Sequence, residues 1–382
     1  MAVNLAVDFA DGRFGDETLA RALRAAEAQG FRLIRAERAG DQLSAWIDWQ
    51  FAPSWWSSEA RAGDVWYALD RDGGIAGFAA FDVRGSRFPW LRPYEQRGDM
   101  GIFGPYGVAP AVRGHGLGGC LLDAALAALR AKGYARALIP AVGFERLIAM
   151  YRTRAGARVV DTFSYDSPRR YRATILASGG GTNAQNVLDR SADGRLPLEV
   201  GALIANADDA GALRRARMAG VGTRTVVWDR ASEPRAAYDT RVLDAVAATE
   251  PDLVLLLGWM HRLPPAFVDR FADILNVHPA FLPFDAEADE VVVPDGRVMP
   301  AFRGAHALRD ALAAGAPWLG ASVHRVTAHV DRGEIMVRTP LPRGEPLRAT
   351  EEAEQSLRPI EHAAVAAAVR RWCFERNYQA AL

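Results

Sequence analysis

The sequence contains little cysteine, and this scarcity excludes two structural classes. Cys120 and Cys373 are the only cysteines in 382 residues, too few for a disulfide framework or a four-cysteine zinc site. Each lies beside apolar residues in a helical pattern, so we expect both to be buried, reduced thiols. We predict no metal site.

Long apolar runs and an excess of one charge are also missing. The longest apolar run, Leu253–Met260, is far shorter than the roughly 20 residues of a membrane helix. The N-terminus carries Asp8 and Asp11 and no preceding basic residue, unlike a secretory signal peptide. Lys+Arg and Asp+Glu number 46 each, and the arginines are scattered, whereas a nucleic-acid-binding face would gather them. We therefore expect a soluble, cytoplasmic protein without membrane or nucleic-acid partners.

The composition and length indicate a globular protein of more than one domain. Hydrophobic residues make up 50% and charged residues 24% of the chain, and this length is typical of about two to three domains. The polar stretch 164–171, SYDSPRRY, lies between two apolar strand patterns. We place the boundary there, with one domain at residues 1–167 and another at 172–382.

The first domain is predicted to be a mixed sheet with helices. Periodicity predicts a helix at Glu17–Gln29, strands at Val65–Leu69, Ile75–Val83 and Gly101–Val108, and a helix at Leu117–Lys132. A glycine-rich turn, Arg113–Gly119, joins the last strand to the last helix. Glycines at a helix start allow backbone N–H groups to bind phosphate, although a plain strand-to-helix connection is the alternative.

The segment around this turn resembles the acetyl-CoA motif of the GNAT acetyltransferases, Arg/Gln-x-x-Gly-x-Gly/Ala. Arg113, Gly116 and Gly118 occupy its fixed positions, and the resemblance covers roughly residues 30–165. It implies a GNAT-like fold with acetyl-CoA as cofactor, its pyrophosphate held by loop N–H groups and its pantetheine paired with the preceding strand. The implied cofactor-binding residues are Val108, Arg113, His115, Gly116, Leu117, Gly118 and Gly119.

A tyrosine is the candidate acid of this half. Ala149–Arg152, followed by Gly156, resembles the GNAT segment that supplies a tyrosine general acid, which implies that Tyr151 protonates the departing CoA thiolate. The alternative is a tyrosine packed in the helix, because the family often has an asparagine where this chain has 144–146, Phe-Glu-Arg. Glu95 and Asp99 lie near the expected strand, but nothing supports either as a base. The half is therefore an active acetyltransferase or a domain that only shapes a substrate site.

The second half alternates strands with helices, which predicts a doubly wound, Rossmann-like α/β domain. Five consecutive apolar residues at Leu253–Leu257 fit a strand buried on both faces. Val221–Trp228 is also strand-like. Ser178–Ala184 follows the first strand and opens a helix, a cradle for phosphate or carboxylate. Because the loop also satisfies G-x-G-x-x-A, an NAD-dependent oxidoreductase remains an alternative, with Asp208 as an imperfectly placed acidic partner.

Three further residues offer the groups that acyl or formyl transfer to an amine requires. Asn276 can hold a developing oxyanion, and His278 can take or relay a proton near pH 7. Asp331, if brought close in space, can orient water or tune the histidine.

This half resembles phosphoribosylglycinamide formyltransferase over about residues 172–375. The matching stretches include ILASGGGTNAQNVLD, PDLVLLLGWMHRLPPAFVDRF, LNVHPAFLP and GASVHRVTAHVDRGEI. The resemblance implies that Asn276, His278 and Asp331 are catalytic and that 10-formyltetrahydrofolate is the donor. The acceptor amine would attack the formyl carbon, with Asn276 and protonated His278 stabilising the oxyanion and Asp331 supporting proton transfer.

The same resemblance implies where the donor and the acceptor bind. The pterin pocket would be lined by Met260, His261, Arg262, Leu263 and Val268. The acceptor phosphate and ribose would meet Gly180, Gly181, Thr182, Asn183, Arg358 and Glu361. The acceptor is glycinamide ribonucleotide or another small amine. An alternative is that the GNAT half is the main catalyst and the second half only binds ligands. A homodimer is also left open.

An insertion departs from the family pattern. Phe284–Met299 is extra, and the turn at Pro294–Gly296 predicts a β-hairpin of Val291–Val293 with Arg297–Met299. It begins shortly after His278, so it either covers a ligand or forms a surface loop. Together with the fused GNAT-like half, it keeps open a different, specialised amine as the substrate beside glycinamide ribonucleotide.

Overall fold

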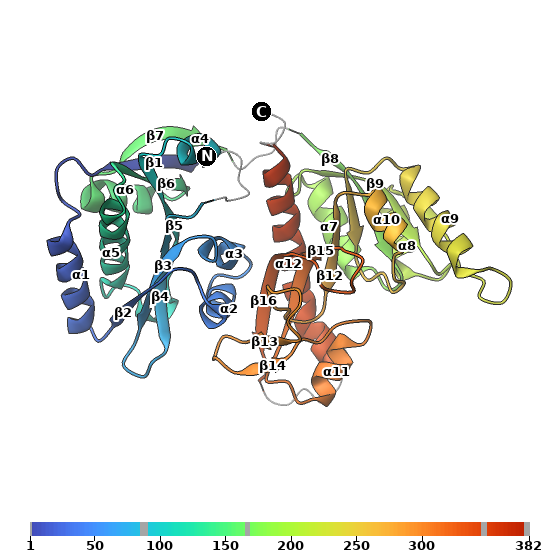
Figure 1. The fold of residues 1–382 in the computed structure, drawn as a ribbon. Helices are drawn as coiled ribbons and strands as arrows, with labels where there is room; N and C mark the ends of the chain where they lie inside the picture. Colours follow the sequence, from blue (N-terminus) through green and yellow to red (C-terminus); the bar gives the residue numbers. More distant parts are fainter. Residues whose placement is uncertain (1, 85–90, 165–168, 345–349, 378–382) are drawn as a thin grey trace. The chain divides into compact units, whose positions relative to one another are not determined.

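The computed structural model describes residues 2–84, 91–164, 169–344 and 350–377, and the chain forms two compact units (Figure 1). The first comprises Met1–Phe51, Trp56–Asp166 and Phe374–Leu382, and the second Ala52–Trp55 and Ser167–Cys373. Both cysteines are free and buried, as predicted. In the described parts of the chain, no helix is long and apolar enough to cross a membrane.

Within its described residues, the first unit builds a seven-stranded sheet of order β2-β3-β4-β5-β6-β1-β7. Neighbouring strands are antiparallel except β5 and β6, which are parallel. The strands are β1 (Ala2–Asp8), β2 (Arg32–Ala36), β3 (Asp64–Leu69), β4 (Ile75–Phe81), β5 (Met100–Val108), β6 (Arg136–Val142) and β7 (Arg158–Phe163). The helices are α1 (Asp16–Ala28), α2 (Asp41–Gln50), α3 (Trp56–Ala60), α4 (Arg92–Glu95), α5 (Leu117–Ala131) and α6 (Glu145–Ala155).

Helix α5 is the centre of this unit because it is apolar on most of its surface. Leu121, Leu122 and Leu126 are fully buried against the sheet, next to β1 residues Leu5 and Val7. The sequence did not predict β1, since its residues are buried on both faces and show no alternation. Pairing with β6 and β7, rather than a local pattern, makes this segment a strand.

Strands β5 and β6 diverge, and this opens the sheet. Among the described residues, their parallel pairing covers only Met100–Ile102, whereas β5 continues to Val108 against β4. The far half of β5 therefore presents backbone groups on one side without a neighbouring strand. The glycine-rich turn and the start of α5 follow directly after this half of β5.

Over its described ranges, the second unit builds a seven-stranded sheet of order β10-β9-β8-β11-β12-β15-β16. The five strands β10, β9, β8, β11 and β12 are mutually parallel. Strand β15 pairs antiparallel with β12, and β16 pairs antiparallel with β15. The strands are β8 (Tyr171–Ala177), β9 (Leu198–Ala205), β10 (Gly222–Thr225), β11 (Leu253–Leu256), β12 (Ile274–His278), β15 (Trp318–Arg325) and β16 (Ile335–Pro342). The helices are α7 (Thr182–Ala192), α8 (Gly211–Met218), α9 (Arg235–Ala247), α10 (Pro265–Arg270), α11 (Ala307–Ala313) and α12 (Thr350–Asn377).

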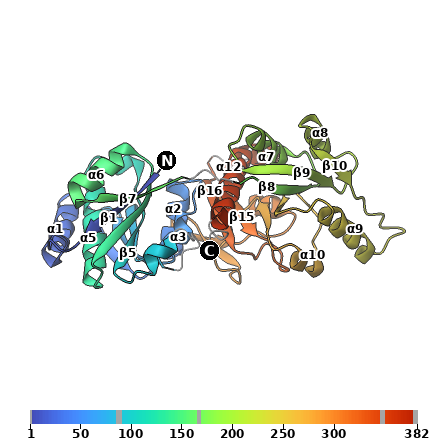
Figure 2. The same cartoon turned by 90° about the horizontal axis from the view of Figure 1, so that it is seen from above.

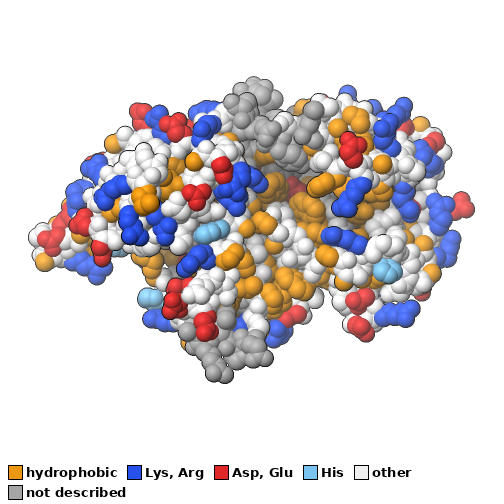
Figure 3. Space-filling view, turned by 180° about the vertical axis from the view of Figure 1, so that it is seen from behind, with side chains coloured by type: hydrophobic (Ala, Val, Ile, Leu, Met, Phe, Trp, Pro, Cys, Tyr) orange, Lys and Arg blue, Asp and Glu red, His pale blue; other side chains and the backbone are white. Residues whose placement is uncertain are grey.

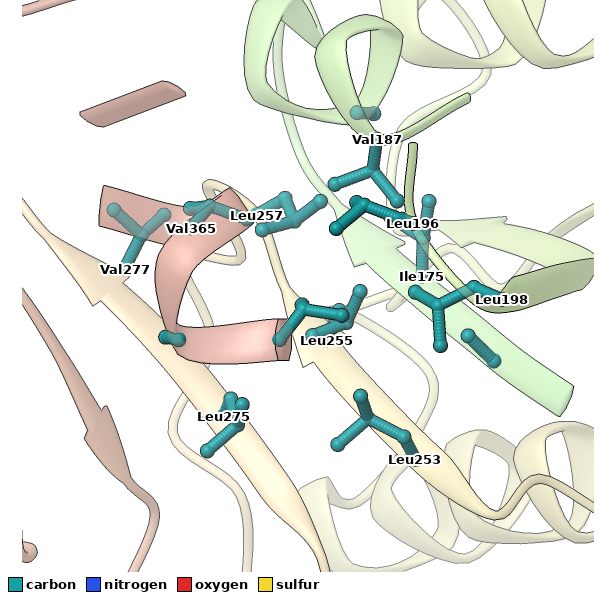
Figure 4. Packing of buried hydrophobic residues seen from close by; sticks show 14 of the residues in the cluster. Ile175, Val187, Leu196, Leu198, Leu253, Leu255, Leu257, Leu275, Val277 and Val365 are labelled. Atoms are coloured by element: carbon teal, nitrogen blue, oxygen red, sulfur yellow. The ribbon is translucent and has the colours of Figure 1, made fainter. Parts of the chain in front are cut away.

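Helices cover both faces of this sheet, as a doubly wound fold requires. Successive residues of one strand enter different cores: Ile175 packs with α7 and α12, whereas Leu176 packs with α9 and α10. Figure 4 shows the first core, in which Val365 of α12 lies over β12 residue Val277, and Figure 2 shows α7 and α9 on opposite sides of the sheet. Each buried aliphatic side chain stabilises the fold by about 1.5–3 kcal/mol relative to exposure.

The predicted fold class is confirmed for both halves: a mixed sheet with helices first and a doubly wound, Rossmann-like sheet second. The strand predicted at Val221–Trp228 is shorter, because the chain leaves the sheet after Thr225 and the Trp228 indole donates to the carbonyl of Glu233. On the face drawn in Figure 3, basic and acidic side chains are interspersed rather than gathered by sign.

The inserted segment forms the predicted hairpin, β13 (Glu290–Val292) with β14 (Val298–Pro300). Val291, Val293 and Met299 are buried, so the hairpin has its own apolar side. The indole of Trp318 on β15 donates to Asp295 at 2.8 Å. The insertion is therefore fastened to the sheet.

Candidate active site

The strand order places the candidate residues at one edge of the second sheet. Strands β8, β11 and β12 are parallel neighbours, so the segments that follow Ala177, Leu256 and His278 leave the same edge. The chain reverses its winding at β8, which has β9 on one side and β11 on the other. Ligands of open α/β sheets bind outside the carboxyl ends of the strands at such a point.

The loop after β8 has the geometry of an anion cradle. Gly181 caps α7 with a φ of 75°, and a Cβ there would lie 2.6 Å from Ala212. The loop is braced from α8, since the Arg215 guanidinium donates to the Gly180 carbonyl at 2.8 Å. The first N–H groups of α7, from Thr182 and Asn183, begin the helix without an intrahelical acceptor. They are available to a phosphate or carboxylate.

Helix α12 brings further predicted residues to this loop. Asn183 donates its side-chain N–H to Glu361 at 3.0 Å. Burial raises the pKa of Glu361, against the opposing effects of Asn183 and Arg358. Among the described residues, Asn183 Oδ1 and His362 Nε2 are buried without a hydrogen-bond partner. A ligand hydroxyl could donate to Asn183 Oδ1, and His362 Nε2 could donate to a phosphate oxygen.

Asp331, more than fifty residues from Asn276 and His278 in the sequence, lies within contact of both. Asp331 Oδ2 is 3.4 Å from His278 Nδ1 and accepts a bond of 2.7 Å from the Gly304 N–H. Asp331 Oδ1 is 3.4 Å from Asn276 Nδ2. Such long separations are common in unliganded active sites and shorten in the complex.

A second histidine, which the sequence analysis did not single out, completes the group. His324 on β15 lies opposite Asn276 on β12, with Nε2 3.1 Å from Asn276 Nδ2 and 3.4 Å from Asp331 Oδ1. Its Nδ1–H donates to the Arg325 carbonyl at 2.9 Å, which leaves Nε2 facing the Asn276 amide and the Asp331 carboxylate. His324 therefore orients the Asn276 amide. The signal was present, since His324 belongs to the stretch GASVHRVTAHVDRGEI.

The proton inventory of the site can be read from its hydrogen bonds. His278 Nε2–H donates to the Phe302 carbonyl at 2.8 Å, so the neutral ring presents an unprotonated Nδ1 to the Asp331 carboxylate. Burial lowers the pKa of His278, although Asp331 and the Phe302 carbonyl act in the opposite direction. Burial would raise the pKa of Asp331, but bonds and charge from His324, His278 and the Gly304 N–H outweigh it and hold that pKa below its usual value. The pair therefore has an ionised carboxylate and room for one proton.

The lowered pKa of His278 predicts a pH dependence of stability. Below the unfolded-state value of about 6.5, the unfolded chain binds a proton that folded His278 excludes. The contribution is present above that pH and is lost as the pH falls toward the folded pKa. The free energy of unfolding of the wild type should therefore decrease more steeply between pH 7 and pH 5 than that of His278→Asn. Parallel denaturant titrations measure this, and equal slopes would contradict it.

The loop predicted to line the pterin pocket follows β11. The Met260 N–H donates to Ser178 Oγ at 2.9 Å, which joins this loop to the end of β8. Met260 is 53% exposed and Arg262 is exposed, whereas Leu263 and Val268 pack against the core with α9 and α10. His261 Nδ1 bonds the Tyr238 hydroxyl at 2.7 Å. In the described residues, the buried Trp259 Nε1 has no partner, which leaves a donor for a ligand here.

In the first unit, the glycine-rich turn also forms a cradle at a helix start. Gly114 and Gly116 have φ values of 86° and 81°, and α5 begins at Leu117. His115 Nδ1 bonds the Arg113 carbonyl at 3.1 Å. The Arg113 guanidinium donates to the Val108 carbonyl at 3.2 Å.

Close packing explains the next two glycines. A Cβ on Gly118 would lie 2.7 Å from the Tyr106 hydroxyl, and one on Gly119 would lie 2.5 Å from the Arg154 guanidinium carbon. The absence of a side chain at Gly118 and Gly119 therefore lets Tyr106 and Arg154 approach the start of α5. The sequence had suggested only cofactor binding as the reason for these two glycines.

Tyr151 is buried beside Phe103 and Tyr106, with ring centroids 6.3 and 6.4 Å away. Burial raises the pKa of Tyr151, so the phenol stays protonated, as an acid must. Asp99 is a poor base, because its bond to Arg136 at 2.5 Å lowers its pKa. Glu95 Oε1 is buried.

Comparisons with known proteins match the two halves of the chain to two different families. A sequence model of the formyl transferase family matches residues 171–285 and 296–369, and one of the acetyltransferase (GNAT) family matches residues 31–157. The phosphoribosylglycinamide formyltransferase of Escherichia coli (strain K12) is 34% identical over 169 residues, 44% of this chain and 71% of that protein. The protein of the same name from Mycobacterium tuberculosis (strain ATCC 25618 / H37Rv) is 36% identical over 45% of this chain and 71% of that protein. The solved structure of glycinamide ribonucleotide transformylase 1 from Symbiobacterium toebii is 32% identical, covers 56% of this chain and 92% of its own, and has a TM-score of 0.47.

Proposed function

Because the chain belongs to the formyl transferase family, we propose that residues 172–382 transfer a formyl group from 10-formyltetrahydrofolate to a small amine. The observation that carries this proposal is the convergence of Asn276, His278 and His324 on the ionised Asp331. That group can take up one proton and can donate from an amide, which is what formyl transfer to an amine requires.

The folate, when bound, supplies the formyl group, and the residues of the chain handle charge and protons. The loop at 258–263, with the unpartnered Trp259 Nε1, fits a polar heterocycle and would hold it next to β12. Asn276 would turn one N–H from Asp331 to the formyl oxygen, a contact that typically contributes about 10²- to 10³-fold in rate. His278 Nδ1 would take the proton that the attacking amine loses and would return it to the nitrogen that departs from the formyl carbon. Asp331 would stabilise the intervening imidazolium.

The acceptor is an amine that carries an anionic group, with glycinamide ribonucleotide as the first candidate. The N–H groups at the start of α7 suit a phosphate. The unpartnered Asn183 Oδ1 and the buried carboxyl of Glu361 suit sugar hydroxyls. Arg358, exposed on α12, adds a positive charge for the phosphate.

The experiment is to mix the full-length protein with 10-formyltetrahydrofolate and glycinamide ribonucleotide. Folate deformylation is followed by absorbance and the product by mass. Acceptor-dependent formylation supports the proposal with this acceptor. The proposal would be overturned if the protein deformylated the folate with none of the phosphorylated amines tested and also failed to bind the folate.

We also propose that residues 1–167 bind acetyl-CoA and acetylate an amine. This second activity is favoured by the divergence of β5 and β6 beside the cradle at Gly114–Leu117 and by the protonated Tyr151. Isothermal titration of the full-length protein with acetyl-CoA should give saturable binding. Gly116→Val should weaken it, because φ of 81° is strained for a branched residue. Gly73→Ala, on the distant β3–β4 turn, is the control. Equal binding by Gly116→Val and wild type would remove the loop from the proposal.

A further inference from the structure

The insertion contacts the turn that carries Asp331. The family model matches the chain up to residue 285 and again from residue 296, and leaves residues 286–295 of the insertion unmatched. Residues 285–289, near the start of the insertion, form a compact turn in which the Ala288 N–H donates to the Asp285 carbonyl. Two carbonyls of this turn accept bonds from arginines: Ala286 from Arg332 at 2.6 Å and Ala288 from Arg303 at 2.7 Å.

Both arginines are also connected to the turn that carries Asp331. Arg332 is the residue after Asp331, and Arg303 donates from Nε to the Asp331 carbonyl at 3.2 Å. Asp289 accepts from both guanidinium groups. Because the Asp289 side chain is 79% exposed, each of its ion pairs adds little by itself. Its charge also opposes the repulsion between Arg303 and Arg332, the two side chains that bond the carbonyls of this turn.

The Asp331 backbone requires such support. Its φ is 53°, a left-handed conformation that costs a non-glycine residue roughly 1–2 kcal/mol. Strained residues persist only where several neighbouring contacts define them. The residues directly after the insertion supply two contacts to the site: the Phe302 carbonyl accepts a hydrogen bond from His278, and the Gly304 N–H donates one to Asp331.

We infer that the inserted turn 285–289 is a positioning clamp, in which Asp289, Arg303 and Arg332 hold Asp331 against His278. This inference rests on the proposed catalytic function of Asp331. The three clamp residues do not touch the reacting atoms. They act by fixing the turn, in a protein whose hairpin is itself fastened to β15 by Asp295 and Trp318.

The test is formyl transfer by Arg332→Ala, Arg332→Lys and Asp289→Asn. Arg332→Ala should lower kcat by roughly 10- to 100-fold, with the KM for the donor changed less than about two-fold. An ionised Asp331 near His278 favours the imidazolium. Displacement of Asp331 should therefore also move the acid limb of the plot of kcat against pH to lower pH. Arg332→Lys, which keeps the charge and one donor, should recover part of kcat, and Asp289→Asn should have a smaller effect in the same direction.

The matched control is Arg297→Ala, which breaks an exposed ion pair with Asp295 elsewhere in the insertion and should leave kcat and its acid limb unchanged. A lower melting temperature for Arg332→Ala with wild-type kcat and acid limb would overturn the clamp. If Asp331→Asn itself retains activity, the proposed function of Asp331 fails. If Asp331→Asn is inactive and Arg332→Ala is normal, only the clamp fails.

Discussion

Asp331→Asn is expected to lower kcat/KM for formyl transfer by about 10²- to 10⁴-fold, the range of general acid–base catalysis. Asparagine has the same shape, so the bond from the Gly304 N–H can persist at the side-chain oxygen. The negative charge that stabilises a protonated His278 is lost. His278→Asn should have a similar effect, because it removes the nitrogen that takes the proton.

Two features of this experiment separate catalysis from folding. Asp310→Asn, at an exposed position on α11, is the matched control and should retain wild-type activity. The double variant Asp331→Asn with His278→Asn should lose little more than either single variant, because the two groups act as a unit. Near wild-type turnover by either single variant would show that the proton goes elsewhere.

Gly333→Ala is expected to disable the same site without changing a polar atom. Gly333 is buried, and a Cβ there would lie 1.6 Å from the Arg325 carbonyl oxygen and 3.2 Å from His324 Nδ1. The backbone at Arg325 is fixed, since its N–H bonds the Glu334 carbonyl at 2.8 Å and closes the turn. The turn must therefore move, and Asp331 lies two residues before the added methyl.

We expect Gly333→Ala to lose about 10²-fold in kcat, the effect of a displacement of about 1 Å at a catalytic group. Overpacking should also cost about 1–3 kcal/mol of unfolding free energy. Gly344→Ala, where a Cβ meets open space, is the control and should change neither quantity. The measurements are kcat on folded protein and denaturant unfolding. Unchanged kcat with reduced stability would mean that the turn relaxes without moving Asp331.

Local patterns in the sequence were sufficient for the elements whose residues face one environment. The run Leu253–Leu257 predicted a doubly buried strand, and β11 lies between two cores. The turn at Pro294–Gly296 predicted the hairpin β13–β14, because its geometry is set by neighbouring residues. By contrast, β1 was not predicted, and of α12 only the helical pattern around Cys373 was. β1 is buried on both faces, and α12 contains Pro359, which interrupts a helical pattern.

The division between sequence and structure is clearest at the candidate site. The sequence by itself pointed to the two glycine-rich loops and to Asn276, His278 and Asp331 as candidate site residues, because glycine spacing and ordered motifs are properties of the chain. Only the tertiary structure decided which groups meet. The antiparallel register of β12 and β15 places His324 against Asn276. The segment that follows the insertion places Arg303 within hydrogen-bond distance of the Asp331 carbonyl. Contacts between residues so far apart in the chain depend on strand order and register, which no local pattern contains.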